Sequence, residues 1–433
     1  MDAKSVIAIF DIGKTNKKLL LFDEQYRLVW ETTSQFAEIE DEDGFACEDI
    51  DALTCWVLES IESLIGDNRF IIKAINFSAY GASLVYLDKN GKVIPPLYNY
   101  LKPYPTELSK RFYVDHGGEQ NISKATASPI LGNLNSGMQL YRIKNQMPEK
   151  YQNIETALHL PQFLSFVLTG NRYSDYTSIG CHTQLWDFTK NNYHDWVMEE
   201  GIDLRLAPIK QCDSLGGYFR DSIPVGIGMH DSSAALIPYL ISFKHPFILI
   251  STGTWCISLN PFNQTALTDE ELKQDCLCYI SYKDKPVKAA RLFAGYEHEQ
   301  AVKKLAVQFN KPLDYYEKVS YDASLLTEHA TQTYESAYHQ LMAEIIVQQV
   351  KSTDLILNGS QVMKIYVDGG FSQNNIYMHL LSEYYSGKEV YAASVPQASA
   401  LGAALAVHEI WNKQTSPSDL IKLNFFSSNK AVE

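Results

Sequence analysis

The feature that most constrains this chain is a pattern that occurs once in each half: a strand, a short polar turn and a return strand. In the first half, the apolar run 6–10 leads through a polar turn into a second apolar run, 19–22. In the second half, the strand-like run 246–251 leads through Thr252-Gly253-Thr254 into a return strand over 255–259. This repetition predicts a duplicated α/β fold with one domain in each half.

Further elements follow each unit in similar order. Spacings of three and four residues predict a helix over 49–66, with Asp49 or Asp51 as N-cap and Gly66 after its end. We also expect a strand at 71–77, a hairpin over 84–94, a strand at 364–367, a helix at 373–386, a strand at 390–393 and a helix at 397–411. We place the N-terminal lobe at 1–223, the C-terminal lobe at 224–412 and a polar surface tail at 413–433.

Length and charge narrow the function. A chain of 433 residues is long enough for about three domains or for two large α/β domains. Lys+Arg 37 against Asp+Glu 51 gives a net charge of 37 − 51 = −14. Such a field repels phosphate backbones and anionic lipid, which argues against nucleic acid or a membrane as a partner.

Targeting and redox signals indicate a cytoplasmic protein. No apolar run approaches the roughly 18 residues of a membrane helix, and Asp11 interrupts the first one too early for a signal peptide. The 7 cysteines are odd in number and scattered along the chain. This pattern favours reduced thiols over a disulfide framework or a cysteine-rich metal site.

The first polar turn, 11–18, combines an acid, a glycine and three lysines. Turns of this composition present backbone N–H groups and hydroxyls to an anion, and Asp11 at a strand end suits water-mediated binding of Mg²⁺. An ordinary hairpin turn with solvated lysines is the alternative. The turn 252–254 and the strand tip at Gly369-Gly370 favour the phosphate interpretation, although no Walker A or Rossmann motif occurs.

The segment 226–236 places a His230-Asp231 pair between a glycine-rich approach and the small residues that begin a helix. The positive end of a helix dipole keeps a carboxylate ionised and able to accept a proton. Asp231 is therefore a candidate general base, with simple N-capping as the alternative. His230 alone is more typical of a satisfied polar residue than of a metal ligand.

Six motifs occur in an order that resembles the FGGY carbohydrate kinases, and most closely their rhamnulokinase- and fuculokinase-like members. They are DIGKTNKK at 11–18, FSAYGASLVYLDKNGKVIPP at 77–96, LPQFLSFVLTGNRYSDYTSIGCHTQLWDF at 160–188, GMHDSSAAL at 228–236, STGTW at 251–255 and GGFSQNNIYMHLLSEYYSGKEVYAASVPQASALGAAL at 369–405. Together they span nearly the whole chain.

The resemblance implies two ribonuclease-H-like lobes of the actin and hexokinase type, which flank a catalytic cleft. It assigns ATP and Mg²⁺ as cofactors, Asp11 as the residue that holds Mg²⁺ through water, and Asp231 as the catalytic base. Tyr80, Gly81, His230 and Asp231 would contact the sugar. The implied nucleotide site consists of Asp11, Gly13, Lys14, Thr15, Asn16, Lys17, Thr252, Gly253, Thr254, Gly369, Gly370, Ser372 and Asn374.

Three positions depart from the pattern of the family. Ser83 stands where rhamnulokinase-like members carry an aspartate, Phe371 replaces the third glycine of the adenosine loop, and Gly295 stands in place of a substrate-contacting asparagine. A serine cannot hold two sugar hydroxyls as a carboxylate does. The identity of the sugar therefore stays open.

The sequence thus predicts an ATP-dependent kinase of a ketose, deoxyketose or polyol. One alternative is a phosphotransferase of the same superfamily with another acceptor, such as an acid or amino sugar. A second is a catalytically idle regulator that binds sugar or nucleotide, because a fold alone does not fix a function. The small-molecule sugar and ATP are the expected partners, and a homodimer stays open.

Overall fold

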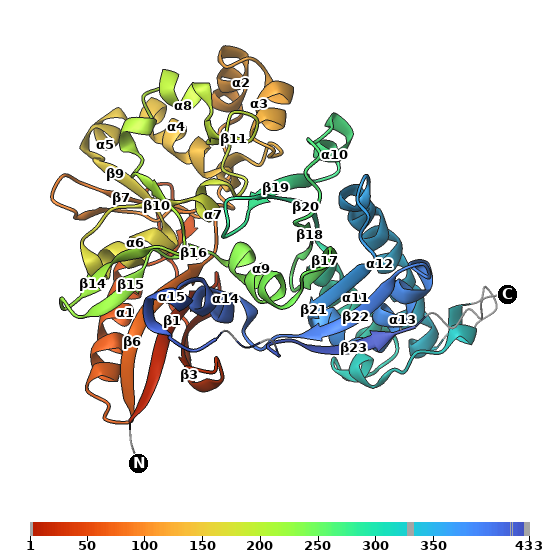
Figure 1. Ribbon diagram of the computed structural model, residues 1–433. Coiled ribbons are helices and arrows are strands. Elements are labelled where there is room, and N and C mark those ends of the chain that lie inside the picture. The colour runs from red at the N-terminus through yellow and green to blue at the C-terminus, as the bar shows by residue number, and fades with distance from the viewer. Residues whose placement is uncertain (1–2, 327–332, 416, 418, 428–433) are drawn as a thin grey trace. The chain divides into compact units, whose positions relative to one another are not determined.

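The computed structural model describes residues 3–326, 333–415, 417 and 419–427 (Figure 1). They form two compact units, each with helices packed on a mixed β-sheet. The first unit comprises Met1–Ser242, Cys278–Pro286 and Pro396–Leu420, and the second comprises Phe243–Leu277, Val287–Val395 and Ile421–Glu433. This architecture confirms the predicted fold class of two α/β lobes.

The first unit is built on a sheet of order β14-β15-β6-β1-β2-β3, with β16 paired to the end of β6. Its strands are β1 (Lys4–Ile12), β2 (Lys17–Asp23), β3 (Leu28–Ser34), β6 (Phe70–Ala79), β14 (Leu215–Phe219), β15 (Ile223–Gly226) and β16 (Met229–His230). β1 runs antiparallel to β2 and parallel to β6. The sheet therefore delivers the ends of β1, β6 and β16 to one edge.

Helices cover both faces of this sheet. α1 (Ile50–Ile65), which was expected from its spacing, and α6 (Leu160–Thr169) pack on one side of β1 through a shared apolar core. Asp49 caps α1 by accepting hydrogen bonds from the N–H groups of Asp51 and Ala52. α9 (Asp231–Ser242) and α14 (Ala398–Ala406) pack against each other so closely that a Cβ at Gly402 would lie 1.9 Å from the carbonyl oxygen of Ala234.

A second apolar core in the first unit lies under the three-stranded sheet β8-β7-β9. Phe112 and Trp196 are packed edge to face at its centre, with ring centroids 5.0 Å apart. The remaining elements of this unit are β4 (Ile39–Glu40), β5 (Ala46–Cys47), β7 (Leu84–Leu87), β8 (Val93–Ile94), β9 (Thr156–His159), β10 (Ser174–Asp175), β11 (Trp186–Asp187), β12 (Asn192–Tyr193), β13 (Ile209–Lys210), α2 (Thr106–Asp115), α3 (Glu119–Ala125), α4 (Ser136–Gln146), α5 (Pro148–Asn153), α7 (Tyr176–Ile179), α8 (Asp195–Glu199) and α15 (His408–Trp411).

The sheet of the second unit has the order β19-β20-β18-β17-β21-β22-β23. Its strands are β17 (Phe247–Thr252), β18 (Cys256–Asn260), β19 (Cys276–Ile280), β20 (Pro286–Leu292), β21 (Lys364–Gly369), β22 (Glu389–Ser394) and β23 (Lys422–Phe426), and its helices are α10 (Asp269–Lys273), α11 (Ala294–Gln308), α12 (Tyr334–Leu357) and α13 (Asn375–Tyr384). β17 pairs antiparallel with β18 and parallel with β21. The turn 252–254 and the tip of β21 therefore lie side by side.

Three segments differ from the sequence expectations. The expected boundary at 223/224 lies inside β15, and the first unit continues to Ser242 because α9 packs on α14 of the same unit. The expected polar tail contains β23, which extends the second sheet by pairing antiparallel with β22. The helix expected over 397–411 is divided at Val407 into α14 and α15. Among the helices of the described residues, none has the length and apolarity that a membrane crossing requires.

Candidate functional site

The turn between β1 and β2 brings Asp11 to the end of the central strand. Asp11 pairs in register with Lys18, and the turn closes with a hydrogen bond of 2.9 Å from the N–H of Gly13 to the carbonyl oxygen of Asn16. Thr15 and Asn16 are exposed at its tip. The turn therefore presents hydroxyl, amide and backbone groups to solvent, as expected for an anion-binding loop.

The lysines of this turn do not act as one cationic group. Lys17 is buried, with its Nζ 2.5 Å from a carboxylate oxygen of Glu48, and Lys14 forms an ion pair of 2.8 Å with Glu38. Lys18 donates a hydrogen bond of 2.9 Å to Gln397 and is the lysine whose charge lowers the pKa of Asp11. The contact of Lys14 and Lys17 with phosphate stays a prediction, and in the structure both lysines form ion pairs with carboxylates far away in sequence.

Asp11 and Asp231 form a pair of carboxyl groups that both resist ionisation. Burial and the charge of Asp231 raise the pKa of Asp11 to about 7, against opposing contributions from Ser78 and Lys18. Burial raises the pKa of Asp231 to about 6, although hydrogen bonds from Ser232 lower it. Oxygen ligands of this kind suit Mg²⁺, whose charge would relieve their repulsion. The residues present therefore fit the divalent cation expected from the sequence.

Asp231 is the first residue of α9. Its Oδ1 accepts a hydrogen bond of 2.6 Å from the N–H of Ser232, and it lies 3.3 Å from Nε2 of His230. An N-cap side chain instead accepts from the second or third N–H of its helix. The geometry around Asp231 is thus closer to that of a candidate base than to that of a cap.

The imidazole of His230 is held in place by its neighbours. A Cβ at Gly81 would lie 2.8 Å from the ring, so only glycine leaves room for it there. The backbone N–H of His230 donates a hydrogen bond of 3.0 Å to Thr177, and its Nε2 lies 3.3 Å from Sγ of Cys181. Burial lowers the pKa of His230 to about 4, so the ring is neutral at pH 7. The two predicted sugar contacts Gly81 and His230 are therefore packed against each other.

Tyr80, the remaining predicted sugar contact, is buried and hydrogen-bonded to a glutamate. Its hydroxyl donates a hydrogen bond of 3.1 Å to Glu48, the residue that also binds Lys17. Ser83, buried below it, replaces the family's aspartate. Glu48 was not predicted, because it lies in a segment without any motif. It joins the polar turn to the predicted sugar pocket.

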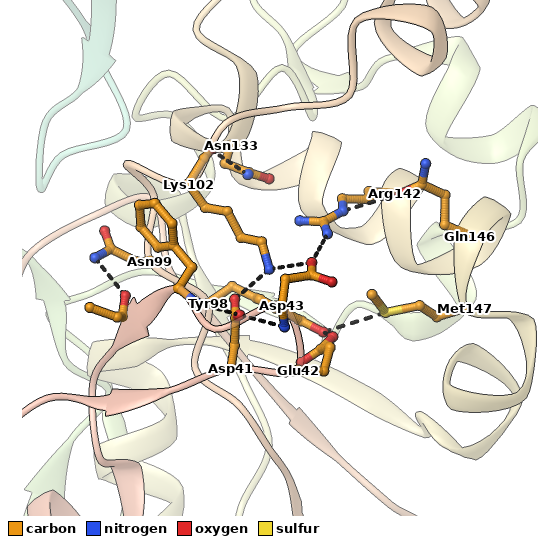
Figure 2. Close-up of polar contacts among 12 residues, drawn as sticks. Asp41, Glu42, Asp43, Tyr98, Asn99, Lys102, Asn133, Arg142, Gln146 and Met147 are labelled. Carbon is orange, nitrogen blue, oxygen red and sulfur yellow. Dashed lines mark hydrogen bonds and ion pairs between the residues drawn. The ribbon is translucent and has the colours of Figure 1, made fainter.

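An ionic cluster around the buried Lys102 and Asp41 fixes the segment that leads to Glu48 (Figure 2). The ammonium group of Lys102 contacts Asp41 and lies 2.7 Å from Asp43, which also accepts a hydrogen bond of 2.9 Å from Arg142. Nearby, Asn99 donates a hydrogen bond of 3.0 Å to the carbonyl oxygen of Ala46, two residues before Glu48. The cluster thus ties the chain at 41–46 to α4 and to the segment 98–102.

The second unit contains the other predicted phosphate loop, which is unusually tightly packed. The hydroxyl of Thr252 donates a hydrogen bond of 2.5 Å to the carbonyl oxygen of Asp368 and accepts one of 3.0 Å from the N–H of Phe371. A Cβ at Gly369 would lie 1.9 Å from the carbonyl oxygen of Thr252, and one at Gly295 would lie 1.8 Å from that of Gly253. Gly295 thus has a structural role in this loop, which explains why no larger residue stands there.

Beside this loop lies a pocket of about 510 Å³. It is lined by Thr252, Gly253, Gly295, His298, Tyr316, Glu317, Val319, Gly370, Phe371, Gln373, Asn374 and Asn375. The volume is within the range of small-molecule sites. Of the predicted adenosine residues, Gly370 and Asn374 line it directly, while Ser372 is turned inward and donates a hydrogen bond of 2.8 Å to Gly369.

The aromatic wall of the pocket was only partly predicted. Phe371 stacks on Tyr377 with ring centroids 4.7 Å apart and meets the ring of His298 edge-on at 5.3 Å. Asn374 donates a hydrogen bond of 2.7 Å to the hydroxyl of Tyr338, which also lies 2.9 Å from Nε2 of His298. Phe371 therefore contributes one side of the pocket and does not fill it. His298 and Tyr338 were not predicted, because they lie on α11 and α12, outside the six motifs of the sequence.

Comparison with known proteins gives consistent matches. The model of the FGGY family of carbohydrate kinases, N-terminal domain, matches residues 6–237, and that of the carbohydrate kinase FGGY, C-terminal domain, matches 244–329. Rhamnulokinase from Oceanobacillus iheyensis is 24% identical over 267 residues, 57% of this chain and 54% of that protein. Rhamnulokinase from Klebsiella pneumoniae is 25% identical over 280 residues, 60% of this chain and 56% of that protein. The chain thus spans little more than half the length of the curated relatives it matches.

Solved structures match over nearly the whole chain. A carbohydrate kinase from Novosphingobium aromaticivorans superposes with a TM-score of 0.81 at 22% identity, covering 99% of this chain and 95% of that one. A ligand-bound xylulose kinase from Lactobacillus acidophilus superposes with a TM-score of 0.82 at 16% identity, covering 98% and 94%. At these identities the likeness concerns the fold.

Proposed function

Because this chain belongs to the FGGY family of carbohydrate kinases, we propose that it transfers the γ-phosphate of ATP to a hydroxyl of a ketose, deoxyketose or polyol. The observation that carries the proposal is the placement of Asp231 at the start of α9, where its pKa is raised to about 6. A base with this pKa is ionised at pH 7 and still basic enough to accept a proton.

In this proposal, Asp231 accepts the proton of the attacking sugar hydroxyl. Such a hydroxyl has a pKa far above 7, and a positioned carboxylate contributes about 10²–10⁴ in rate. His230 is neutral and buried beside it, so it holds the carboxylate in place without adding a charge. Gly81 and Tyr80 would shape the sugar pocket around these two side chains.

The rest of the reduction in the activation barrier for phosphoryl transfer would come from electrostatic stabilisation. Asp11 would hold Mg²⁺ through water, and the cation, when bound, supplies positive charge to the transferring phosphoryl oxygens. Lys18 is the lysine of the first turn best placed to help, because its charge already acts on Asp11. Gly13, Thr15 and Asn16 would offer backbone and side-chain donors to the phosphates.

We propose that the pocket of the second unit binds the adenosine of ATP. Phe371 and His298 provide ring surface for a base, and Gly370 and Asn374 also line the pocket. Thr252 is the last residue of β17, and Gly253 and Thr254 follow it. These three residues would bind phosphate oxygens, mainly through Gly253 and Thr254, which are exposed. In this proposal, the residue that holds Mg²⁺ lies at the end of β1, and the hydrogen-bond donors to phosphate lie in the turns that follow β1 and β17.

A substrate panel tests the proposal. ADP release is measured with ATP and Mg²⁺ against ketoses, deoxyketoses, polyols, sugar acids and amino sugars. We expect one of the first three classes to exceed the water-driven background, and Asp231→Asn to reduce that rate by about 10²–10⁴. Asp51→Asn, which changes an exposed acid in the first turn of α1, serves as the matched control and is expected to leave the rate unchanged.

Each other outcome has a defined meaning. Turnover with sugar acids or amino sugars alone would favour the phosphotransferase with a different acceptor. Binding of nucleotide without ADP release from any acceptor would favour the idle regulator. Retention of the rate within a few fold in Asp231→Asn would show that this residue is not the base.

A further inference from the structure

One cysteine and two histidines gather beside Asp231, and the proposed reaction gives the cysteine and one of the histidines no role. Cys181 and His182 follow α7, and His230 ends β16. Sγ of Cys181 and one ring nitrogen of each histidine all lie within 4.8 Å of one another, and all three residues are buried. This cluster joins residues that are about fifty positions apart in the sequence.

The ligand atoms have the composition and spacing of a zinc-class site. Thiolate and imidazole are the ligands that Zn²⁺ and Co²⁺ prefer, with metal bonds of about 2.3 Å to sulfur and about 2.0–2.1 Å to nitrogen. Tetrahedral geometry with such bonds separates the ligand atoms by roughly 3.5 Å. Sγ of Cys181 and Nε2 of His230 are already 3.3 Å apart. Because all three ligand atoms lie within 4.8 Å of one another, closing the cluster around a cation needs shifts of up to about 1.3 Å, chiefly at His182.

The second histidine is already oriented for coordination. Nδ1 of His182 lies 3.0 Å from the carbonyl oxygen of Leu134, and a carbonyl oxygen can only accept. Nδ1 therefore carries the proton, which leaves the lone pair on Nε2. Metal-binding histidines are commonly fixed by such a bond to a backbone carbonyl. His182 also has a φ of 41°, in the left-handed region. This backbone conformation is energetically unfavourable for a residue other than glycine, yet it is retained at the position that places this side chain.

A fourth ligand lies next to the cluster. Oδ1 of Asp231 is 3.3 Å from Nε2 of His230, the same nitrogen that approaches Cys181. One thiolate and one carboxylate together balance the two positive charges of a divalent cation, while both imidazoles bind as neutral ligands. Burial of such a neutral assembly avoids the cost of an unpaired charge.

We propose that Cys181, His182 and His230 bind a thiophilic divalent cation of the zinc class, with Asp231 as the fourth ligand. On binding, the thiol releases its proton to solvent as the metal–sulfur bond forms, and no electron is transferred. Because Asp231 would then be coordinated, the cation would inhibit phosphoryl transfer. The inhibition rests on the proposed function, whereas the binding does not.

Cobalt(II) titration of the full chain tests the binding directly. We expect saturation at one equivalent, with a near-ultraviolet thiolate-to-Co²⁺ charge-transfer band and the visible bands of four-coordinate Co²⁺. Cys181→Ser should abolish the charge-transfer band, and His182→Gln should weaken affinity by at least about tenfold. The matched control is Cys55→Ser, which removes an exposed thiol on α1 and should leave the spectrum unchanged.

Two results would overturn the site: absence of the charge-transfer band in the parent protein, or its persistence in Cys181→Ser. Near-ultraviolet circular dichroism confirms that each variant is folded, and His182→Gln gives a second reading if Cys181→Ser is not. Inhibition is measured separately, as loss of ADP release on addition of Zn²⁺ and its recovery with a chelator. Unchanged ADP release at saturating Zn²⁺ would refute the coordination of Asp231 while leaving the three-ligand site intact.

Discussion

Asp231→Asn should stabilise the first unit at the same time as it removes activity. Burial raises the pKa of Asp231 from 3.8 to about 6, which means that the ionised carboxylate lowers the stability of the folded protein. Roughly two pKa units correspond to about 3 kcal/mol, at about 1.4 kcal/mol per unit. Because the side chain is 33% exposed, solvent screening reduces this to about 1–2 kcal/mol.

The sign of the effect depends on pH. A carboxyl group whose pKa is higher in the folded state favours folding while it is protonated, and this contribution is lost as pH rises from 3.8 through about 6. Asparagine carries no charge at any pH. The variant should therefore gain stability over the parent at pH 8, and the gain should disappear as the pH falls to about 4. Asp11, His230 and Ser232 face the carboxylate and are kept unchanged in the comparison.

Thermal unfolding at the two pH values measures this directly. A gain of 1–2 kcal/mol corresponds to a rise of about 2–5 °C in the melting temperature at pH 8. The same substitution at Asp49, an N-cap that asparagine replaces equally well, is the control and should shift the melting temperature little at either pH. A lower melting temperature for Asp231→Asn at pH 8 would show that Asp231 is a structural cap and would refute this reasoning.

Three further substitutions test the supporting structure. Gly295→Ala places a Cβ within 1.8 Å of the carbonyl oxygen of Gly253 and should therefore displace this turn. In initial-rate kinetics we expect the ATP KM to rise about tenfold while the sugar KM stays unchanged. Equal effects on both KM values would contradict this expectation. Lys102→Met leaves Asp41 buried without its cation and should lower the free energy of unfolding by about 3–5 kcal/mol in urea titrations. A loss of less than about 1 kcal/mol would contradict a stabilising role of this ion pair. Lys18→Met should lower kcat about tenfold or more with a stable fold, and an unchanged kcat would remove Lys18 from phosphate binding.

The sequence predicted local features well, because their causes are local. The helix α1 begins after Asp49 and ends before Gly66, as its spacing and caps indicate. The strand and turn around Asp11 are also as expected, since a β-branched apolar run followed by a glycine turn has few alternatives. The polar turn of the second unit follows the same rule.

Features that depend on distant contacts could not be predicted. Lys17 is buried because Glu48 lies 2.5 Å away, and nothing in a run of lysines tells which of them has an acid partner elsewhere. Gly295, on α11, is needed because the turn at Gly253 approaches it closely, a constraint that exists only after folding. The boundary between the two units was expected at 223/224, before Asp231. It lies after Ser242, because small residues let α9 pack on α14 of the first unit.

The two acids of the first unit bear on how a chain of net charge −14 would bind the anionic nucleotide that we propose as its substrate. Near pH 7, Asp231 with a pKa of about 6 is mostly ionised, whereas Asp11 with a pKa of about 7 is close to half protonated. Added positive charge, such as that of the Mg²⁺ that we propose Asp11 holds, would therefore favour the ionised form of both carboxyl groups. Arrival of that charge would ionise Asp11 and leave Asp231 free to accept the proton of the acceptor. The global charge is thus a poor guide to phosphate binding, because the local balance of two carboxylates and Lys18 determines what can bind there.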